Sequence, residues 1–410
     1  MENITDINLG ALQLYDLLHG VTAFIFAVLM SFVTTPIVRV IAYKIGALDI
    51  PKDDKETRRM HKVTIPRLGG LAIAFSFVTS IFLFYEITNA ALGMIIGAFI
   101  IVLIGIIDDV YKIRAFYKFI AQLAAAGIVA SQGVVIEHIN IFGEWIHFGH
   151  FAVPLTILWI VGLVNAVNLI DGLDGLACGI STISALSLLA VTILIGEFKI
   201  ALLIAIIAGS CIGFLPFNRN PAKIIMGDTG AMFLGFALAV VSIQGVFKVH
   251  AVVTFVIPFL ILGVPIFDTL FAMLRRLLSG RSPFSADRGH LHHRLIDMGF
   301  TTKQSVRILY AVSALLGISS IMLITHRIVY AVVIMAVSLG ISAVMLVIFK
   351  DEKMKYESGI MTDPNENGIA GDSTAEEYEE DNIDLIGLNE TKAGENKNEF
   401  KQAKAEKSQR

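Results

Sequence analysis

Apolar runs of membrane-spanning length recur along most of this 410-residue chain. A helix rises about 1.5 Å per residue, so about 20 apolar residues cross the roughly 30 Å hydrocarbon core of a bilayer. Of all residues, 55% are hydrophobic and only 16% are charged, whereas a soluble protein carries about 25% charged residues. The sequence therefore predicts an all-α polytopic membrane protein.

The apolar runs predict about eleven transmembrane helices. We expect them near residues 17–40, 68–86, 91–107, 116–133, 151–170, 175–196, 198–216, 229–247, 251–274, 305–325 and 327–349. An odd number of spans places the two ends of the chain on opposite sides of the membrane. With the N-terminus outside, the inner connections before the tail carry twenty Lys and Arg residues against three in the outer connections. Since cytoplasmic loops are rich in Lys and Arg, this difference predicts an external N-terminus and a cytoplasmic C-terminus.

Three regions follow from this topology: a short extracellular N-terminus over 1–16, a transmembrane domain with cytoplasmic loops over 17–349, and a tail over 350–410. The tail is too polar to form a core and is predicted to be disordered in the cytoplasm.

The outer loop over 132–154 alternates apolar and polar residues, which favours a small hairpin. The acidic start of the chain does not resemble a cleavable signal peptide. The net charge of −3 gives no reason to expect a nucleic-acid partner.

One polar stretch, residues 165–177, lies between two of the apolar runs. It contains Asn165, Asn168, Asp171 and Asp174 within ten residues. An ionised Asp at the centre of a membrane helix costs about 2.5 to 3.5 kcal/mol on insertion scales, so the stretch must lie at a membrane surface or in a polar cavity. We interpret it as part of a functional site.

Four further polar clusters fall on the same predicted cytoplasmic face. Their oxygen-rich composition suits Mg²⁺ or Mn²⁺, which often binds one or two carboxylates together with substrate phosphates. Each cluster alone could be a helix cap, a turn or an exposed loop, and the histidines could bind Zn²⁺ as a His-x-His pair. Five clusters on one face favour a single phosphate-binding site. The four are PRLGG at 66–70 with Lys62, DDVYK at 108–112, FNRNPAKIIMGDTG at 217–230, and SPFSADRGHLHH at 282–293.

These motifs, in this order, resemble the polyprenyl-phosphate N-acetylhexosamine-1-phosphate transferases. The resemblance rests on PRLGG, IGIIDDVYK, NAVNLIDGLDGLA, FNRNPAKIIMGDTG and PFSADRGHLHHRLID, and it covers about residues 20–349. It implies transfer of a sugar 1-phosphate from a UDP-sugar to undecaprenyl phosphate, with Mg²⁺ and with release of UMP. The enzyme would lie in the bacterial plasma membrane with its active site facing the cytoplasm.

The resemblance also implies roles for individual residues. Asp228 corresponds to a metal ligand, with Asp108 and Asp171 as further candidate ligands. The position of Ile225 usually carries an aromatic residue that stacks on uracil, so this chain departs from the family there. We assign catalytic roles to Asp108, Asp109, Asp171, His290, His292 and His293, and substrate contacts to Lys62, Lys112, Asn168, Asp174, Asn218 and Arg288.

Several alternatives stay open at this stage. Phospho-MurNAc-pentapeptide transferases carry three consecutive histidines in the last loop, whereas HLHH at 290–293 favours the branch that uses UDP-GlcNAc and starts polymers such as teichoic acid. A secondary transporter would also contain intramembrane polar residues, although usually near the bilayer midplane. A non-catalytic scaffold would depend on the tail instead. Direct attack by the lipid phosphate, a phospho-enzyme route and assembly as a homodimer are likewise undecided.

Overall fold

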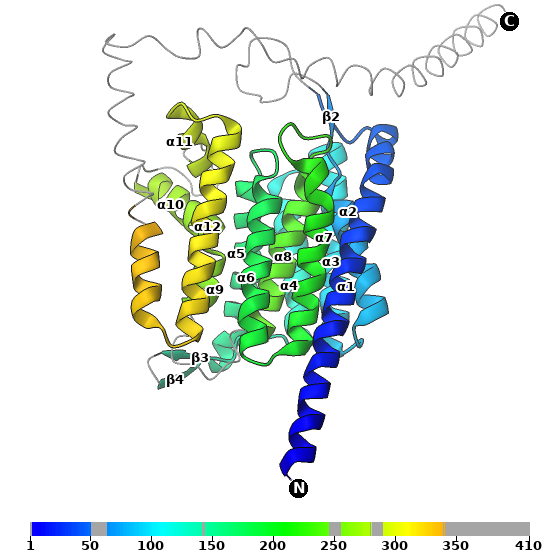
Figure 1. Cartoon of the computed structure of the whole chain (residues 1–410). Helices are drawn as coiled ribbons and strands as arrows, with labels where there is room; N and C mark the ends of the chain where they lie inside the picture. The colour runs from blue at the N-terminus through cyan, green and yellow to red at the C-terminus, as the bar shows by residue number, and fades with distance from the viewer. Residues whose placement is uncertain are drawn as a thin grey trace, which may run out of the picture. The chain divides into compact units, whose positions relative to one another are not determined.

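The structure is a computed structural model, and it describes residues 2–50, 64–141, 144–245, 256–278, 280, 290–338 and 340. The side chains of residues 2–14, 140 and 141 are not described. All described residues belong to one compact unit, residues 1–346. Most of its helices run roughly along one axis, as Figure 1 shows. The tail predicted over 350–410 lies outside the described residues.

Helices dominate the described part of the chain. They are α1 Glu2–Ile45, α2 Gly70–Phe84, α3 Asn89–Tyr111, α4 Ala115–Ser131, α5 Ala152–Ile170, α6 Leu176–Leu194, α7 Phe198–Asn218, α8 Gly227–Gly245, α9 Val256–Ile261, α10 Gly263–Leu278, α11 Leu291–Asp297 and α12 Thr302–Ile324. A further apolar helix covers Ile328–Ser338. Short strands form two antiparallel pairs, β1 Leu48–Asp49 with β2 Ile65–Pro66, and β3 His138–Ile141 with β4 Glu144–His147.

Helix is present in the described part of every predicted span, which confirms an all-α membrane-type protein. Among the described residues, seven helical segments are long and apolar enough to cross a membrane, while three more apolar helices are shorter. The count of eleven spans and the sidedness of the termini stay predictions. The seven are Tyr15–Ile45, Asn89–Tyr111, Gly149–Ile170, Leu176–Leu194, Phe198–Asn218, Gly227–Gly245 and Thr302–Ile324.

The ninth predicted span, 251–274, differs from a single helix. Its described part is divided into α9 and α10, with a turn at Leu262. Pro265 has no backbone N–H to donate to the Ile261 carbonyl, and Gly263 has a low helix propensity, so the helical ladder breaks at this point. Beyond the break, α10 continues to Leu278 and carries Arg275 and Arg276 in its last turn.

The loop between α4 and α5 forms the small hairpin that its alternating sequence predicts. Residue His138 pairs with His147 and Ile141 pairs with Glu144. The hairpin lies at the end of the bundle opposite to β2 and α11 (Figure 1).

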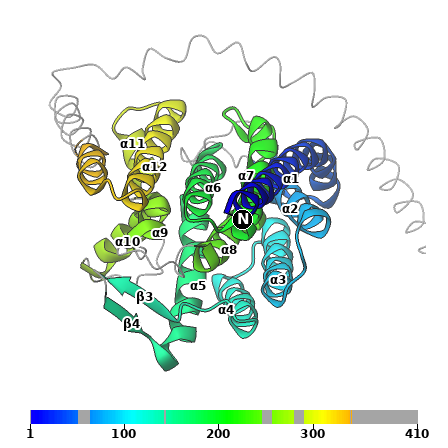
Figure 2. The ribbon, with the colours of Figure 1, turned by 60° about the horizontal axis from the view of Figure 1, so that its bottom comes forward.

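Helix α8 is the core of the bundle. It contacts α2, α3, α5, α6 and α7, and almost all of its residues are buried. Seen from the hairpin end, α9, α10 and α12 stand together beside α5 and α6 (Figure 2). A Cβ atom added to Gly70 of α2 would collide with the backbone of Gly230 in α8. Backbones that approach this closely pack without side chains between them, as is common between membrane helices.

The direction of each helix decides where the polar motifs lie. Helices α3, α5 and α7 end, and α4, α6 and α8 begin, at the end of the bundle that carries β2 and α11 (Figure 1). The described parts of all five polar motifs are therefore at one end of the molecule.

Candidate active site

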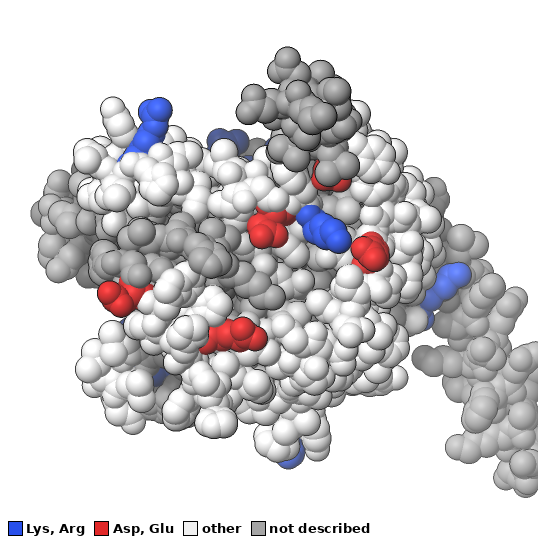
Figure 3. All heavy atoms as spheres, turned by 90° about the horizontal axis from the view of Figure 1, so that it is seen from below, with Lys and Arg blue, Asp and Glu red and all other residues white. Residues whose placement is uncertain are grey.

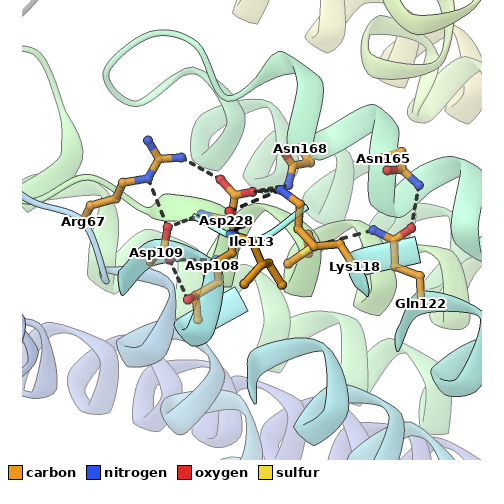
Figure 4. A network of polar contacts seen from close by, with 11 residues as sticks. Arg67, Asp108, Asp109, Ile113, Lys118, Gln122, Asn165, Asn168 and Asp228 are labelled. Carbon is orange, nitrogen blue, oxygen red and sulfur yellow. Dashed lines mark hydrogen bonds and ion pairs between the residues drawn. The ribbon is translucent and has the colours of Figure 1, made fainter. Parts of the chain in front are cut away.

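A cluster of carboxylates and cations joins three helices and the segment before α2 at this end. Asp108 and Asp109 lie in the last turn of α3, Lys118 in the first turn of α4, and Asp228 in the first turn of α8. Arg67 reaches the cluster from the segment between β2 and α2. Figure 4 shows these side chains directed toward Asp228. Each element begins or ends here, so polar side chains meet without crossing the apolar interior.

Asp109 caps helix α8 from α3. Its Oδ1 accepts the backbone N–H of Asp228 at 3.0 Å, and its Oδ2 accepts the N–H of Thr229 at 3.0 Å and the Thr229 hydroxyl at 2.7 Å. The first N–H groups of a helix lack partners within the helix, and a carboxylate satisfies them and complements the helix dipole. Arg67 Nε adds a fourth hydrogen bond at 3.0 Å. Because its oxygens are already engaged, this geometry suits a positioning role for Asp109.

Gly227 makes that cap sterically accessible. Its φ is +74°, and a Cβ atom there would lie 2.6 Å from Asp109 Oδ2. A side chain at residue 227 would both strain the backbone and displace the carboxylate. The glycine of the GDTG motif thus allows α3 to hold the start of α8.

Asp228 is bound by two protein cations. Arg67 Nη2 lies 2.6 Å from Oδ1, and Lys118 Nζ lies 2.7 Å from Oδ2. Asn168 Nδ2, from the last turn of α5, donates to Oδ2 at 3.3 Å. The neighbouring carboxylates raise the pKa of Arg67 above its ordinary value although burial opposes this shift. The site therefore balances a buried negative group with fixed positive charge.

Asp108 shares one of these cations. Lys118 Nζ lies 3.2 Å from its Oδ2, and its Oδ1 accepts the backbone N–H of Ile113 at 3.0 Å. Lys112, between them in the chain, ends α3 with a left-handed backbone conformation and an exposed side chain. Partial desolvation of its amine by the surrounding chain and the positive charge of the nearby Arg67 lower the pKa of Lys112. Lys118 thus links the carboxylate of α3 to that of α8.

A pair of amides continues the polar region one turn deeper into the bundle. Asn165 Nδ2 donates to Gln122 Oε1 at 2.7 Å and to the Val161 carbonyl at 2.8 Å. Gln122 is one turn after Lys118 on α4, and Asn165 is one turn before Asn168 on α5 (Figure 4). The pair therefore fixes α4 against α5 directly below the charged groups.

Asp171 directly follows α5 and is the carboxylate without a direct partner. Its side chain makes no hydrogen bond or ion pair with any described residue. Burial raises the pKa of Asp171 to about 7, with Asp228 adding to the rise and Arg67 opposing it. A partly buried carboxylate that lacks a counter-ion is suited to bind a cation or to accept a proton.

The donor chemistry fits Mg²⁺, although the described residues alone do not enclose an ion. No three His, Cys, Asp or Glu side chains converge on a point that could hold a metal within the described ranges. Mg²⁺ usually needs only one or two carboxylates, with phosphate and water completing its octahedron. Asp228 and Asp171 are the residues that would hold it, with Asp108 nearby.

Two predicted substrate residues hold the loop between α7 and α8. Asp174 Oδ2 accepts the side-chain amide of Asn220 at 3.0 Å and the N–H of Ala222 at 3.1 Å. Asn218 donates to the Ile224 carbonyl at 3.0 Å. The loop is tied to β2 through Ile225, whose N–H donates to the Pro66 carbonyl at 2.8 Å. These contacts position the loop, and substrate contact by Asp174 and Asn218 stays a prediction.

The histidine segment lies beside Asp171. His290 Nδ1 lies 2.9 Å from Asp268 Oδ2, and Asp268 Oδ1 accepts the Leu291 N–H at 2.7 Å. His292 is buried against Gly172, and neither of its ring nitrogens has a hydrogen-bond partner among the described residues. Burial, with a contribution from His293, lowers the pKa of His292 to about 4.

The structure brings some of the predicted site residues together and adds partners that the sequence did not indicate. The structure brings together Asp108, Asp109, Asn168 and Asp228. Lys62 and Arg288 lie outside the described residues. Sequence reasoning missed Arg67, Lys118 and Asp268 as site residues. Arg67 belongs to the PRLGG motif, and Asp268 lies within a predicted span, where an ionisable residue is itself a functional signal.

Known proteins with related sequences define the class. Residues 91–246 match the family model described as glycosyl transferase family 4. A probable undecaprenyl-phosphate N-acetylglucosaminyl 1-phosphate transferase of Bacillus subtilis (strain 168) is 41% identical over 307 residues, which cover 74% of this chain and 84% of that protein. The chain therefore belongs to glycosyl transferase family 4, among the polyprenyl-phosphate N-acetylhexosamine-1-phosphate transferases.

More distant relatives carry similar names. A decaprenyl-phosphate N-acetylglucosaminephosphotransferase of Mycobacterium tuberculosis (strain ATCC 25618 / H37Rv) is 32% identical over 325 residues, covering 72% of this chain and 78% of that protein. An undecaprenyl-phosphate alpha-N-acetylglucosaminyl 1-phosphate transferase of Yersinia pestis is 29% identical over 316 residues, covering 74% and 84%. All three names describe transfer of a sugar phosphate to a polyprenyl phosphate.

Proposed function

We propose that this protein transfers GlcNAc-1-phosphate from UDP-GlcNAc to undecaprenyl phosphate, giving undecaprenyl-diphospho-GlcNAc and UMP. The observation that carries the proposal is the cluster at Asp228, where carboxylates and cations from three helices and from the segment before α2 meet at one end of an apolar bundle. A lipid phosphate and a water-soluble diphosphate can meet only where the membrane ends. The names of the relatives support the lipid acceptor and the sugar.

The reaction exchanges one phosphorus–oxygen bond for another. A lipid phosphate oxygen attacks the sugar-bearing β-phosphorus of the donor, and the bond from that phosphorus to the bridging oxygen breaks. UMP leaves with the bonding electron pair. Such transfers depend mainly on positioning and on stabilising the charge on the phosphoryl oxygens. Mg²⁺, held by Asp228 with Asp171, would supply part of that stabilisation.

The residues of the chain divide the remaining work. Lys118, between Asp108 and Asp228, attracts the lipid phosphate, and Asp108 orients it or accepts its proton. Asp109 keeps Asp228 in place through its cap on α8. We assign His292 to contact the donor, because it lies beside Gly172 and its ring nitrogens have no hydrogen-bond partner in the described part of the chain. These assignments favour direct attack over a phospho-enzyme on Asp108.

The charge at the two ends of the bundle supports a cytoplasmic active site. The end that carries the β3–β4 hairpin is mostly uncharged, with separate acidic side chains and few basic ones (Figure 3). The Lys and Arg residues at the other end include Arg67, Lys112 and Lys118. Because positive residues remain in the cytoplasm, we place the active site there, in a bacterial plasma membrane.

A reconstituted assay tests the proposal. Purified protein is incubated with undecaprenyl phosphate, Mg²⁺ and either UDP-GlcNAc or UDP-MurNAc-pentapeptide, and UMP release is measured. We expect UMP with UDP-GlcNAc only, and loss of most activity in Asp228→Asn. UMP with neither donor would refute the proposal, and UMP with the pentapeptide donor alone would assign the protein to peptidoglycan synthesis. A labelled sugar phosphate trapped on Asp108 without lipid would contradict direct attack.

One further role follows from the same proposal. The GlcNAc-linked lipid would be the first membrane intermediate of a cell-envelope polymer such as teichoic acid.

A transporter is less consistent with the site, since transport sites usually lie near the bilayer midplane and these carboxylates lie at helix ends.

A further inference from the structure

Both oxygens of Asp228, the expected metal ligand, are already engaged by protein cations. Arg67 Nη2 contacts Oδ1 at 2.6 Å and Lys118 Nζ contacts Oδ2 at 2.7 Å. A divalent cation that binds either oxygen would share that atom with a protein cation, and repulsion between the two positive charges opposes this binding. The order in which ligands enter the site depends on which cation moves.

Departure of Lys118 would leave Asp108 without a cation, with the Ile113 N–H as its remaining hydrogen-bond donor among the described residues. The Lys118 amine also lies 3.2 Å from Asp108 Oδ2, so both Asp108 and Asp228 would lose a cation. An unpaired buried charge is strongly unfavourable. Lys118 is thus the more firmly held of the two.

Departure of Arg67 has a smaller consequence. Its second partner, Asp109, retains the hydrogen bonds from the backbone N–H groups of Asp228 and Thr229 and from the Thr229 hydroxyl. Asp228 retains Lys118 and Asn168. Without Arg67, the remaining contacts therefore still compensate part of the negative charge of Asp109 and of Asp228.

Arg67 is also the cation suited to receive a phosphate. Its side chain is 28% exposed, whereas the side chain of Asp109 is fully buried. Nη1 makes no hydrogen bond with a described residue. The planar guanidinium matches two phosphate oxygens at once, a geometry that an amine cannot reproduce.

We propose that Arg67 is an internal counter-ion that exchanges partners when a nucleoside diphosphate binds. Without that ligand Arg67 holds Asp228 Oδ1 and opposes metal binding. When the diphosphate arrives, Arg67 moves to its oxygens and frees Oδ1 for a divalent cation. The inference rests on the proposed function for its two ligands, and it predicts that each ligand strengthens binding of the other beyond their direct contact.

Metal binding without turnover tests this exchange. Full-length protein in lipid nanodiscs, with no undecaprenyl phosphate, is titrated with Mn²⁺ in the presence and absence of UDP, and free Mn²⁺ is followed by electron paramagnetic resonance. We expect the factor by which UDP strengthens Mn²⁺ binding to be on the order of tenfold larger in the unmodified protein than in Arg67→Gln. In Arg67→Gln, Mn²⁺ binding without UDP becomes tighter, while binding with UDP changes little.

Two variants separate this exchange from a general loss of charge. Arg67→Lys keeps the charge but cannot bridge Asp109 and Asp228 in the same way, so it should keep weak Mn²⁺ binding without UDP and show a reduced UDP effect. Arg307→Gln removes an exposed arginine of α12 at the same end of the bundle and should behave like the unmodified protein. Thermal melting of each variant establishes that it is folded.

The result that overturns the inference is an equal UDP effect in the unmodified protein and Arg67→Gln. A uniform gain in Mn²⁺ affinity, with and without UDP, would also overturn it, since simple removal of a positive charge produces that pattern. These outcomes are distinct from failure of the proposed function, which would appear as absent UMP release in the lipid assay.

Discussion

Asp109 and Asp108 are adjacent carboxylates for which the structure predicts different consequences of substitution. In Asp109→Asn, one oxygen is replaced by an NH₂ group that faces the donors of Thr229, so at least one buried donor loses its acceptor. An unpaired buried donor costs about 1 to 3 kcal/mol, and the weakened contact with the partly exposed Arg67 adds up to about 1 kcal/mol. We expect the free energy of unfolding to fall by about 1 to 4 kcal/mol.

The same substitution should also reduce activity, because the start of α8 carries Asp228. A shift of about 1 Å in a catalytic group can lower turnover about 100-fold. Thermal unfolding in detergent micelles, followed by intrinsic fluorescence, measures the first effect. UMP release from UDP-GlcNAc measures the second. Asp109→Asn should therefore be both less stable and less active.

Asp108→Asn is the matched control. Asp108 contacts Lys118 and the Ile113 N–H but does not contact the backbone of α8. Its loss should abolish most activity while leaving the melting temperature nearly unchanged. If Asp109→Asn melts at the unmodified temperature and Asp108→Asn is the unstable variant, the assignment of capping to Asp109 is wrong.

Three further predictions concern other parts of the site. Gly227→Ala should destabilise the fold by about 1 to 3 kcal/mol in thermal melting, because its Cβ would meet the Asp109 carboxylate at a positive φ. The pKa of Asp171 is raised from 3.8 to about 7, so the native state binds a proton that the unfolded state has lost, and the contribution of Asp171 to stability should decline between about pH 4 and 7. Asp171→Asn should flatten that decline in melting curves of metal-free protein. Asp268→Asn should lower activity about tenfold, and its effect should be non-additive with His290→Asn in UMP release, because one hydrogen bond joins the two side chains.

Hydrophobic run length was sufficient to predict the helices, because a bilayer requires closed backbone hydrogen bonding over about 20 residues. It failed at Leu262, where mean hydropathy does not register that Pro265 removes one hydrogen bond. The alternation that predicted the hairpin succeeded because a strand exposes every second residue to the same side. Local patterns thus predicted elements, but not every break within them.

The site was predictable in composition and less so in its pairings. Carboxylates next to apolar runs are expensive, so Asp108, Asp171 and Asp228 were conspicuous in the sequence. The capping function of Asp109 was not visible in the sequence, since it depends on α3 ending beside the start of α8. Lys118 was counted only as an inner-loop charge, because no sequence spacing joins it to a residue 110 positions away.

The close contact between Gly70 and Gly230 limits how the site can respond to a ligand. Backbones packed without intervening side chains tie α2 to α8, and hydrogen bonds from Gly69 and Gly70 to Ile225 and Met226 reinforce the contact. The backbones of Arg67 and Asp228 are thereby held at a fixed separation. Release of the guanidinium then needs side-chain rotation and the loss of its two ion pairs, but not the sliding of packed helices, which takes microseconds or longer. Arg67 can therefore exchange partners without rearrangement of the bundle.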